Sequence, residues 1–249
     1  MTTVKSSLRT LDILEVFAIR QEPLSLQQLS DQLNVPQSSM SMLVKTLIER
    51  GYIERNARTR MLYPTLRVQM LGLWMVRRHK RAGKLPQLLR ELSLQTGETT
   101  SLSMRNDIYV QYILVHEARN PERARIESGM LYPLACGAPG WCLLSFESAK
   151  TINAIAWRTQ AEVKDPHWRK TARLAPERVR ETIRNGYGMS RGETDPRVSG
   201  ISILLPSVPG AMAMAATVGG PIGRIEEKKT MILQALQGLS KSFLMLHDG

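Results

Sequence analysis

The amino-acid sequence predicts an α+β protein built from two modules. Apolar residues recur at helical spacing through residues 8–48, and two short strand-like segments follow directly. Residues 99–218 alternate short strand patterns with helical ones, which favours an antiparallel sheet covered by helices. Gly83-Lys84-Leu85-Pro86 interrupts two helical patterns and separates these regions. We therefore expect a small module at residues 1–65, a connecting helix at 66–82 and a larger module at 83–249.

Composition narrows the class of protein. The chain has 249 residues, of which 43% are hydrophobic, so it can fill a core and is not disordered throughout. It contains no apolar run of about 18 residues, its first residues lack the apolar region of a secretion signal, and two cysteines make no disulfide framework. These features predict a cytoplasmic protein with no membrane partner. The net charge of +12 is uneven: residues 1–82 hold 13 basic and 6 acidic residues, which points to a polyanionic partner for the first module.

The first module begins with a helix whose apolar positions run from Leu8 to Ala18 and which ends before Pro23. Ser25 has the features of an N-cap, with Gln28 as its capping-box partner, so a short second helix follows. The segment Asn34-Val35-Pro36 makes a tight break, and Pro36 suits the first turn of a third helix. The third helix has an apolar inward face, formed by Met40, Leu43, Val44, Leu47 and Ile48.

A basic hairpin follows the third helix. Gly51 ends that helix, and residues 52–55 and 60–63 have strand patterns around the turn Asn56-Ala57-Arg58-Thr59. The order of helices, turn and hairpin is that of a winged helix-turn-helix, in which a helix enters the major groove and an arginine-tipped wing reaches phosphates or the minor groove. A small helical domain with a solvated polar face is the alternative. The predicted contacts to a double-stranded DNA operator are Gln37, Ser38, Ser39, Ser41, Met42, Lys45, Thr46, Arg55, Arg58 and Arg60.

The connecting helix carries one apolar stripe and a basic end. Leu66, Met70, Leu73 and Trp74 share that stripe, which favours a helix-packing or dimer surface. In the larger module, a helix from Leu85 ends at Gly97, and a hairpin turns at Asn106-Asp107. Further strands are predicted at 124–127, 187–190, 201–205 and 212–218, and further helices at 140–146, 149–157, 176–185 and 224–246. The residue pattern predicts this α+β sheet module but reveals no pocket.

One motif raises an enzyme hypothesis. Gly188-Met189-Ser190-Arg191-Gly192 matches the Gly-x-Ser-x-Gly pattern of serine hydrolases, which need that serine on a strand-to-helix turn, followed by an acid and a histidine. Only His247 follows it, so we disfavour a hydrolase that uses Ser190 and expect no enzyme. Cys136 and Cys142 match no zinc spacing, which favours two inert buried thiols and no metal. No nucleotide-cofactor motif occurs, so we expect no cofactor.

Several segments, in order, resemble the IclR family of bacterial transcriptional regulators over nearly the whole chain. They are residues 8–17, 26–33, 51–55 with Tyr63, 96–99, 132–134 with Gly140, 186–193 and 219–225. The resemblance implies a winged helix-turn-helix, a linker helix and a GAF-like effector-binding domain. It further implies homodimers or homotetramers on pseudo-palindromic operators, and a small-molecule effector that is often anionic or aromatic. The stretch from Ser38 to Arg55 also resembles MarR-like regulators, an alternative that leaves residues 83–249 unexplained.

The resemblance also implies an effector site. Its candidate residues lie before the helix at 140–146, on the strand after Gly186, at the start of the next strand and on the last strand: Ala138, Pro139, Ser190, Gly200, Thr217 and Gly219. The alternative is that these small residues only permit close packing. The chain departs from the family at Met42, where an arginine is common, and at Gly140-Trp141, where the family has Gly-Lys. We therefore expect weaker cationic contact from the third helix and a changed pocket entrance. The sequence does not decide between repression and activation, or between dimer and tetramer.

Overall fold

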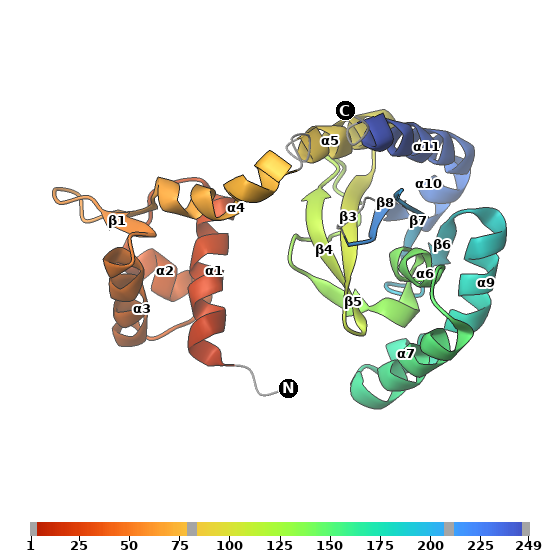
Figure 1. Cartoon of the computed structure of the whole chain (residues 1–249), viewed down its shortest axis with the longest axis horizontal. Coiled ribbons are helices and arrows are strands. Elements are labelled where there is room, and N and C mark those ends of the chain that lie inside the picture. The colour runs from red at the N-terminus through yellow and green to blue at the C-terminus, as the bar shows by residue number, and fades with distance from the viewer. Residues whose placement is uncertain (1–3, 79–83, 207–211, 246–249) are drawn as a thin grey trace. The chain divides into compact units, whose positions relative to one another are not determined.

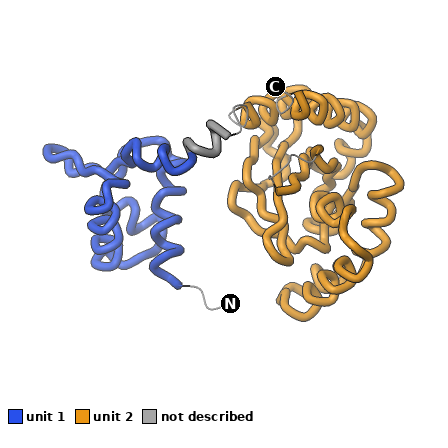
Figure 2. The backbone as a smooth tube through the Cα atoms, viewed as in Figure 1, with its two compact units in different colours: residues 1–80 blue, residues 81–249 orange. Residues whose placement is uncertain are grey.

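The computed structural model describes residues 4–78, 84–206 and 212–245; for residues 73–78 it describes the backbone alone. The chain forms two compact units, residues 1–80 and 81–249, each of which is described by itself (Figure 2). The α+β fold class predicted from the sequence is confirmed. No helix in the described ranges is long and apolar enough to cross a membrane.

The first unit is three helices followed by a two-stranded hairpin and a fourth helix (Figure 1). Its elements are α1 (Lys5–Arg20), α2 (Leu26–Leu33), α3 (Gln37–Glu49), β1 (Ile53–Arg55), β2 (Leu62–Pro64) and α4 (Leu66–Arg78). Ile13 and Phe17 of α1, Leu29 of α2, and Met40 and Val44 of α3 are buried in one core. The predicted capping box is present, since the side chain of Ser25 accepts from the Gln28 N–H and the Gln28 side chain accepts from the Ser25 N–H.

The second unit is built on one antiparallel sheet of six strands in the order β5-β4-β3-β8-β7-β6. The strands are β3 (Thr99–Asn106), β4 (Tyr109–His116), β5 (Leu131–Pro133), β6 (Gly188–Arg191), β7 (Val198–Leu204) and β8 (Met214–Pro221). The helical elements of this unit are α5 (Leu85–Thr96), η2 (Leu134–Cys136), α6 (Ala138–Leu144), α7 (Ala149–Glu162), α8 (Pro166–Ala172), α9 (Ala175–Asn185), α10 (Ile222–Glu227) and α11 (Lys229–Met245).

Two hydrophobic cores lie on the two faces of this sheet. On one face, Leu102, Ile201 and Val218 pack with Leu89 of α5 and Leu236 of α11, two helices that lie side by side (Figure 1). On the other face, α6 is buried along its whole length, α9 packs against it, and α7 packs against α9 and η2. Alternation of side chains along each strand separates these faces, so small polar residues of β3, β7 and β8 face α6.

The structure corrects several predicted elements. Residues 124–127 were expected to form a strand, but they form a loop, and the edge strand is β5 instead. The backbone of this loop is held by a side chain, because the Thr99 hydroxyl donates to the Ala124 carbonyl oxygen at 3.0 Å. Helix α8 was not predicted. The single helix expected at 224–246 is two helices, α10 and α11, which meet at Lys228, and Leu246 lies outside the described residues.

Candidate functional site

Helix α3 presents a polar face to solvent. Its buried positions are Met40, Val44 and Leu47, which hold the helix against α1 and α2. All of the predicted contact residues on the opposite side are exposed except Ser39, which is half-buried: Gln37, Ser38, Ser41, Met42, Lys45 and Thr46. The Met42 side chain is 67% exposed, which is unusual for methionine and leaves it available to a partner.

The turn before α3 fixes the direction of the helix. Asn34 takes a left-handed conformation at the end of α2, as asparagine tolerates better than most residues. The buried Ser30 hydroxyl donates to the Val35 carbonyl oxygen at 2.6 Å, which anchors the segment that leads into Pro36. Helix α3 therefore starts at a defined place relative to α2, as a recognition helix requires.

The hairpin formed by β1, β2 and the turn between them is the wing. Ile53 pairs with Pro64 and Arg55 with Leu62. The Asn56 side-chain oxygen accepts from the backbone N–H groups of Arg58 and Thr59, both at 3.0 Å, so the tip is ordered by an Asx turn. A bridge between Leu24 and Leu62 joins the wing to the segment before α2. The wing is thereby fixed to the helical core.

The charges of this surface are available to an anion. Arg55, Arg58 and Arg60 are exposed, and none of them forms an ion pair within the described ranges. Lys45 forms an exposed ion pair with Glu49, with 3.8 Å between Nζ and Oε1, a weak contact that phosphate can displace. Guanidinium groups at a hairpin tip and hydroxyl and amide groups on a helix together match a nucleic-acid backbone and base edges.

In the second unit, four of the six residues predicted for an effector site lie on the sheet face toward α6, and the other two begin α6. Ser190 of β6 pairs with Gly200 of β7, which pairs with Gly219 of β8. Thr217 lies opposite Ser202, and their hydroxyl oxygens are 2.8 Å apart. A Cβ on Gly188 would lie 2.7 Å from the Ala138 carbonyl oxygen, so the start of α6, with Ala138 and Pro139, contacts β6 closely. All six residues are buried, and we call them the inner cluster.

A cavity of about 500 Å³ lies next to the inner cluster but is lined by other residues. A Cβ on Gly219 would be 3.6 Å from the Ala124 Cβ, and one on Gly137 would be 3.0 Å from the Thr194 methyl group. Ala124 and Thr194 both line the cavity, so the cavity borders the inner cluster at Gly219 and reaches Gly137, the residue before Ala138. The cavity walls were not predicted from the sequence; they include Tyr112, Arg123, Arg125, Tyr132 and Arg197. Most of them lie in loops that no periodicity marks, although Tyr132 belongs to a segment that carries the family resemblance.

The cavity combines aromatic walls with cations. Tyr112 and Tyr132 meet edge to face, with ring centroids 5.8 Å apart. Burial raises the pKa of both tyrosines, so each phenol keeps its proton and remains a hydrogen-bond donor. The cavity can therefore hold a small aromatic or apolar body and also attract a negative group.

The cations of the cavity differ in how far they are neutralised. Arg123 pairs with Glu117, and Arg197 pairs with Asp195, an ion pair whose hydrogen bonds lower the pKa of that carboxyl. Arg125 has no ion-pair partner among the described residues. Its guanidinium is therefore the cation most available to a ligand carboxylate.

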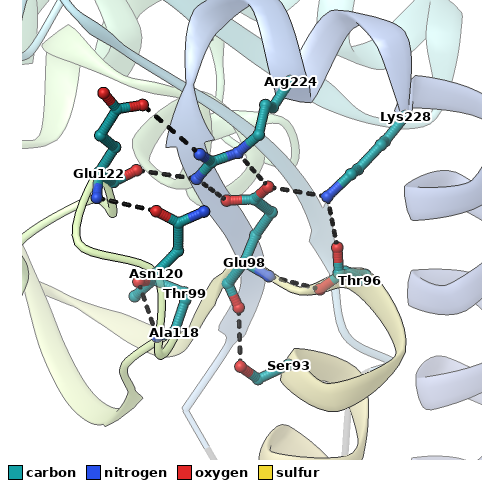
Figure 3. A network of polar contacts seen from close by, with 9 residues as sticks. All are labelled: Ser93, Thr96, Glu98, Thr99, Ala118, Asn120, Glu122, Arg224 and Lys228. Atoms are coloured by element: carbon teal, nitrogen blue, oxygen red, sulfur yellow. Dashed lines mark hydrogen bonds and ion pairs between the residues drawn. The ribbon is translucent and has the colours of Figure 1, made fainter.

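A polar network fastens the loop that forms one wall of the cavity (Figure 3). Arg224 of α10 donates to both carboxylate oxygens of Glu98 at 2.8 and 2.9 Å, and to the Glu122 carbonyl oxygen at 2.8 Å. Lys228 donates to the same Glu98 carboxylate and to the Thr96 carbonyl oxygen, both at 3.0 Å. The cavity wall at Glu122 is thereby tied to the start of β3, to the end of α5 and to α10.

Two predictions about chemistry can be compared with the geometry. Ser190 lies inside β6, paired with Gly200, and not on a strand-to-helix turn, so the serine-hydrolase motif lacks its required setting. Cys136 and Cys142 are buried, and burial raises the pKa of each thiol to about 12. Within the described ranges, no three His, Cys, Asp or Glu side chains gather as metal ligands would.

Trp141, where a changed pocket entrance was expected, is not among the residues that line the 500 Å³ cavity. Its side chain is buried, and its Nε1–H donates to the Ala135 carbonyl oxygen at 3.0 Å. Gly140 beside it cannot be replaced, since a Cβ there would lie 1.9 Å from the Leu134 carbonyl oxygen. Tryptophan at this position therefore packs in the core. It also lines a second, smaller hollow of about 250 Å³.

Comparison with known proteins agrees with this architecture. The IclR helix-turn-helix domain matches residues 6–57, and the C-terminal domain of the bacterial transcriptional regulator IclR matches residues 76–243. The probable transcriptional regulator SauR of Cupriavidus necator is 24% identical over 188 residues, covering 76% of this chain and 75% of that protein. The regulator BhcR of Paracoccus denitrificans is 25% identical over 222 residues, covering 89% and 79%.

Solved structures show the same fold. An IclR homolog from Microbacterium hydrocarbonoxydans, complexed with 4-hydroxybenzoate, is 17% identical with a TM-score of 0.65, covering 95% of this chain and 98% of that one. The match to the IclR C-terminal domain accounts for the module that a MarR-like regulator leaves unexplained. With both of its units matched, the chain belongs to the IclR family of transcriptional regulators.

Proposed function

We propose that this regulator binds a DNA operator through α3 and the wing, and that a small-molecule effector in its second unit controls that binding. One observation carries the DNA part: the polar face of α3 and three unpaired wing arginines lie on one small unit with its own core. The proposed base and groove contacts are those on α3, and the proposed phosphate contacts are Lys45, Arg55, Arg58 and Arg60. With methionine at position 42, the wing arginines supply more of the phosphate contact.

The proposed effector is a small organic acid or aromatic metabolite. The tyrosine walls and Arg125 of the cavity support an aromatic carboxylate, and 500 Å³ falls within the usual size range of ligand pockets. A structural neighbour is complexed with 4-hydroxybenzoate, which has this chemistry. We propose that the inner end of the effector reaches the inner cluster, Ala138, Pro139, Ser190, Gly200, Thr217 and Gly219, where the hydroxyl groups of Ser190 and Thr217 supply hydrogen-bond donors.

We further propose that the working form is a homodimer or homotetramer. Helix α1 exposes Leu8, Leu11 and Ile19, and α4 exposes Leu66 and Met70. Exposed apolar side chains on neighbouring helices favour cover by a second copy of the same unit. Two copies present two recognition helices, as a pseudo-palindromic operator requires.

Effector control requires two states of the oligomer that differ in affinity for both DNA and effector. Fluorescence anisotropy with a duplex from upstream of the gene, measured with and without 4-hydroxybenzoate, tests the whole proposal. We expect salt-dependent binding to that duplex and a change in affinity when an aromatic acid is present. An absence of DNA affinity even at low salt would refute the DNA part. A screen of aromatic and aliphatic acids without any thermal shift would refute the effector part.

A further inference from the structure

A second hollow lies beside β6, at the edge of the sheet, and shares no lining residue with the effector cavity. It measures about 250 Å³ and is formed by the last turns of α9, by β6, by Lys229 at the start of α11 and by Trp141. Its volume lies below that of pockets that take drug-sized ligands. Any occupant is therefore small.

The walls of this hollow are rich in cations. Arg178, Arg184, Arg191 and Lys229 line it, against one carboxylate, Glu181. Two of the four cations are held by acids: Arg178 pairs with Glu181 and Glu193, and Arg191 pairs with Glu226. When these three acids are counted, one positive charge remains in excess.

The other two cations have no acid partner within the described ranges. Arg184 is exposed at the end of α9 and makes no described ion pair. The Lys229 ammonium lies 5.3 Å from the centroid of the Tyr187 ring, a contact that positions it without neutralising it. The Arg178 guanidinium is similarly held 5.7 Å from the centroid of the Trp141 ring. Pre-positioned cations bind an anion at a lower entropic cost than freely moving ones.

We propose that this hollow binds a small oxyanion with two negative charges, of which inorganic phosphate is the simplest example. Guanidinium groups match the oxygen spacing of phosphate and carboxylate, and an ammonium adds a compact charge. The small volume of the hollow suits a small anion. The site is distinct from the effector cavity, where Arg125 meets aromatic walls.

The position of β6 gives this site a regulatory consequence. Met189 and Arg191 line the hollow, while Ser190 between them is buried in the inner cluster on the face toward α6. An anion bound by Arg184 and Lys229 therefore lies against the strand that holds Ser190. This consequence rests on the proposed function, whereas anion binding itself does not.

Calorimetric titration of the full-length protein with potassium phosphate, at constant ionic strength in a chloride buffer, tests the proposal. We expect one saturable site per chain. The double variant Arg184→Gln/Lys229→Gln removes the two cations without acid partners and should weaken phosphate binding by about tenfold or more. Its matched control, Lys150→Gln/Lys241→Gln, removes the same charge from exposed positions of α7 and α11 outside the hollow and should bind phosphate as the wild type does.

Three outcomes would overturn the inference: no saturable heat with the wild type, equal weakening in the control variant, or displacement of phosphate by a random-sequence duplex. The first two would reduce the hollow to ordinary surface charge, and the third would make it part of a nucleic-acid surface. Operator binding in the absence of phosphate and effector is measured on the same variants and should match that of the wild type. A wild-type protein that binds phosphate but no operator would contradict the proposed function and leave the phosphate site standing.

Discussion

Arg224 and Glu98 form a two-pronged ion pair that joins α10 to the start of β3. The Glu98 carboxylate is completely buried, and Lys228 is its second cationic partner. A Cβ on Gly220 would lie 2.4 Å from a Glu98 oxygen, so the glycine makes room for this carboxylate. Hydrogen bonding to Glu98 also raises the pKa of Arg224, which keeps the guanidinium charged.

Arg224→Ala should lower the free energy of unfolding by about 3 kcal/mol, because it leaves a buried carboxylate with only part of its compensation. Urea-induced unfolding measures this change. Arg197→Ala is the matched control: Arg197 pairs with Asp195, but its side chain is 88% exposed. That control should change stability by less than about 1 kcal/mol. Equal effects of the two variants would show that burial of Glu98 is not what makes the pair important.

Arg58→Ala should weaken binding to every DNA sequence and make the slope of log K against log salt less negative by about 0.9. The Arg58 side chain makes no described contact within the protein, and only its backbone N–H belongs to the Asx turn, so folding should be unaffected. Anisotropy titrations at several salt concentrations measure the slope. Arg119→Ala, an exposed arginine of the second unit, is the control. An unchanged slope in Arg58→Ala would remove the proposed phosphate contact.

Met42→Arg should strengthen DNA binding and make the same slope steeper by about 0.9 per added phosphate contact. Position 42 is exposed, so the longer side chain fits without repacking the core. Met42→Gln adds a polar group without charge and should leave the salt slope unchanged. If both variants bind like the wild type at every salt concentration, position 42 does not face the DNA.

Arg125→Gln should weaken the binding of an aromatic carboxylate such as 4-hydroxybenzoate by about tenfold, since one charge-assisted hydrogen bond is lost. Binding of phenol, which has the ring without the carboxylate, should be insensitive to this change. Thermal-shift titration measures both affinities. Arg123→Gln, whose parent side chain already pairs with Glu117, is expected to have a smaller effect. Equal losses for acid and phenol would place the carboxylate elsewhere.

The two thiols should resist modification and make the protein sensitive to alkali. Burial raises the pKa of Cys136 and Cys142 from 9.0 to about 12 in the folded state, so their contribution to stability is complete below pH 9 and is lost as the pH rises toward 12. Over that range the unfolded chain binds fewer protons than the folded one. Thiol-reactive dye should label neither cysteine near pH 8 until the chain unfolds. The variant Cys136→Ala/Cys142→Ala lacks both thiols. Between pH 7 and pH 12 its free energy of unfolding should therefore fall less than that of the wild type.

The helices, turn and wing of the first unit could be predicted from the sequence because their signals are local. The capping box at Ser25, the break at Asn34 and the hairpin turn at Asn56 each depend on neighbouring residues. Helix α8, which was not predicted, had a local signal too. The Asp165 side chain accepts from the His167 N–H, and Pro166 stands at the first helical position, a combination that marks the start of a helix. The strand β5 had none, since it has three residues and contains Pro133 at a sheet edge.

The 500 Å³ cavity could not be predicted because its walls depend on contacts between distant residues. Residues 124–127 look like a strand, yet the Thr99 hydroxyl, far away in the sequence, holds that backbone as a loop. The resemblance led to buried small residues behind the cavity, whereas Tyr112 and Arg125 at its walls are brought together only by the sheet and its covering loop. Strand propensity depends on neighbouring residues. It does not reveal that a distant side chain, instead of a neighbouring strand, binds this backbone.

The bridge between Leu24 and Leu62 limits how this regulator can respond. Two backbone hydrogen bonds, of 3.1 and 2.8 Å, join the wing to the segment before α2, and both side chains are buried. A change in the angle between wing and α3 would have to break these bonds inside a packed core, where polar groups without partners are costly. Under the proposed function, each copy would therefore read its half-site in one fixed way. A regulating ligand would alter how often the operator is occupied, and the preferred base sequence of each half-site would stay the same.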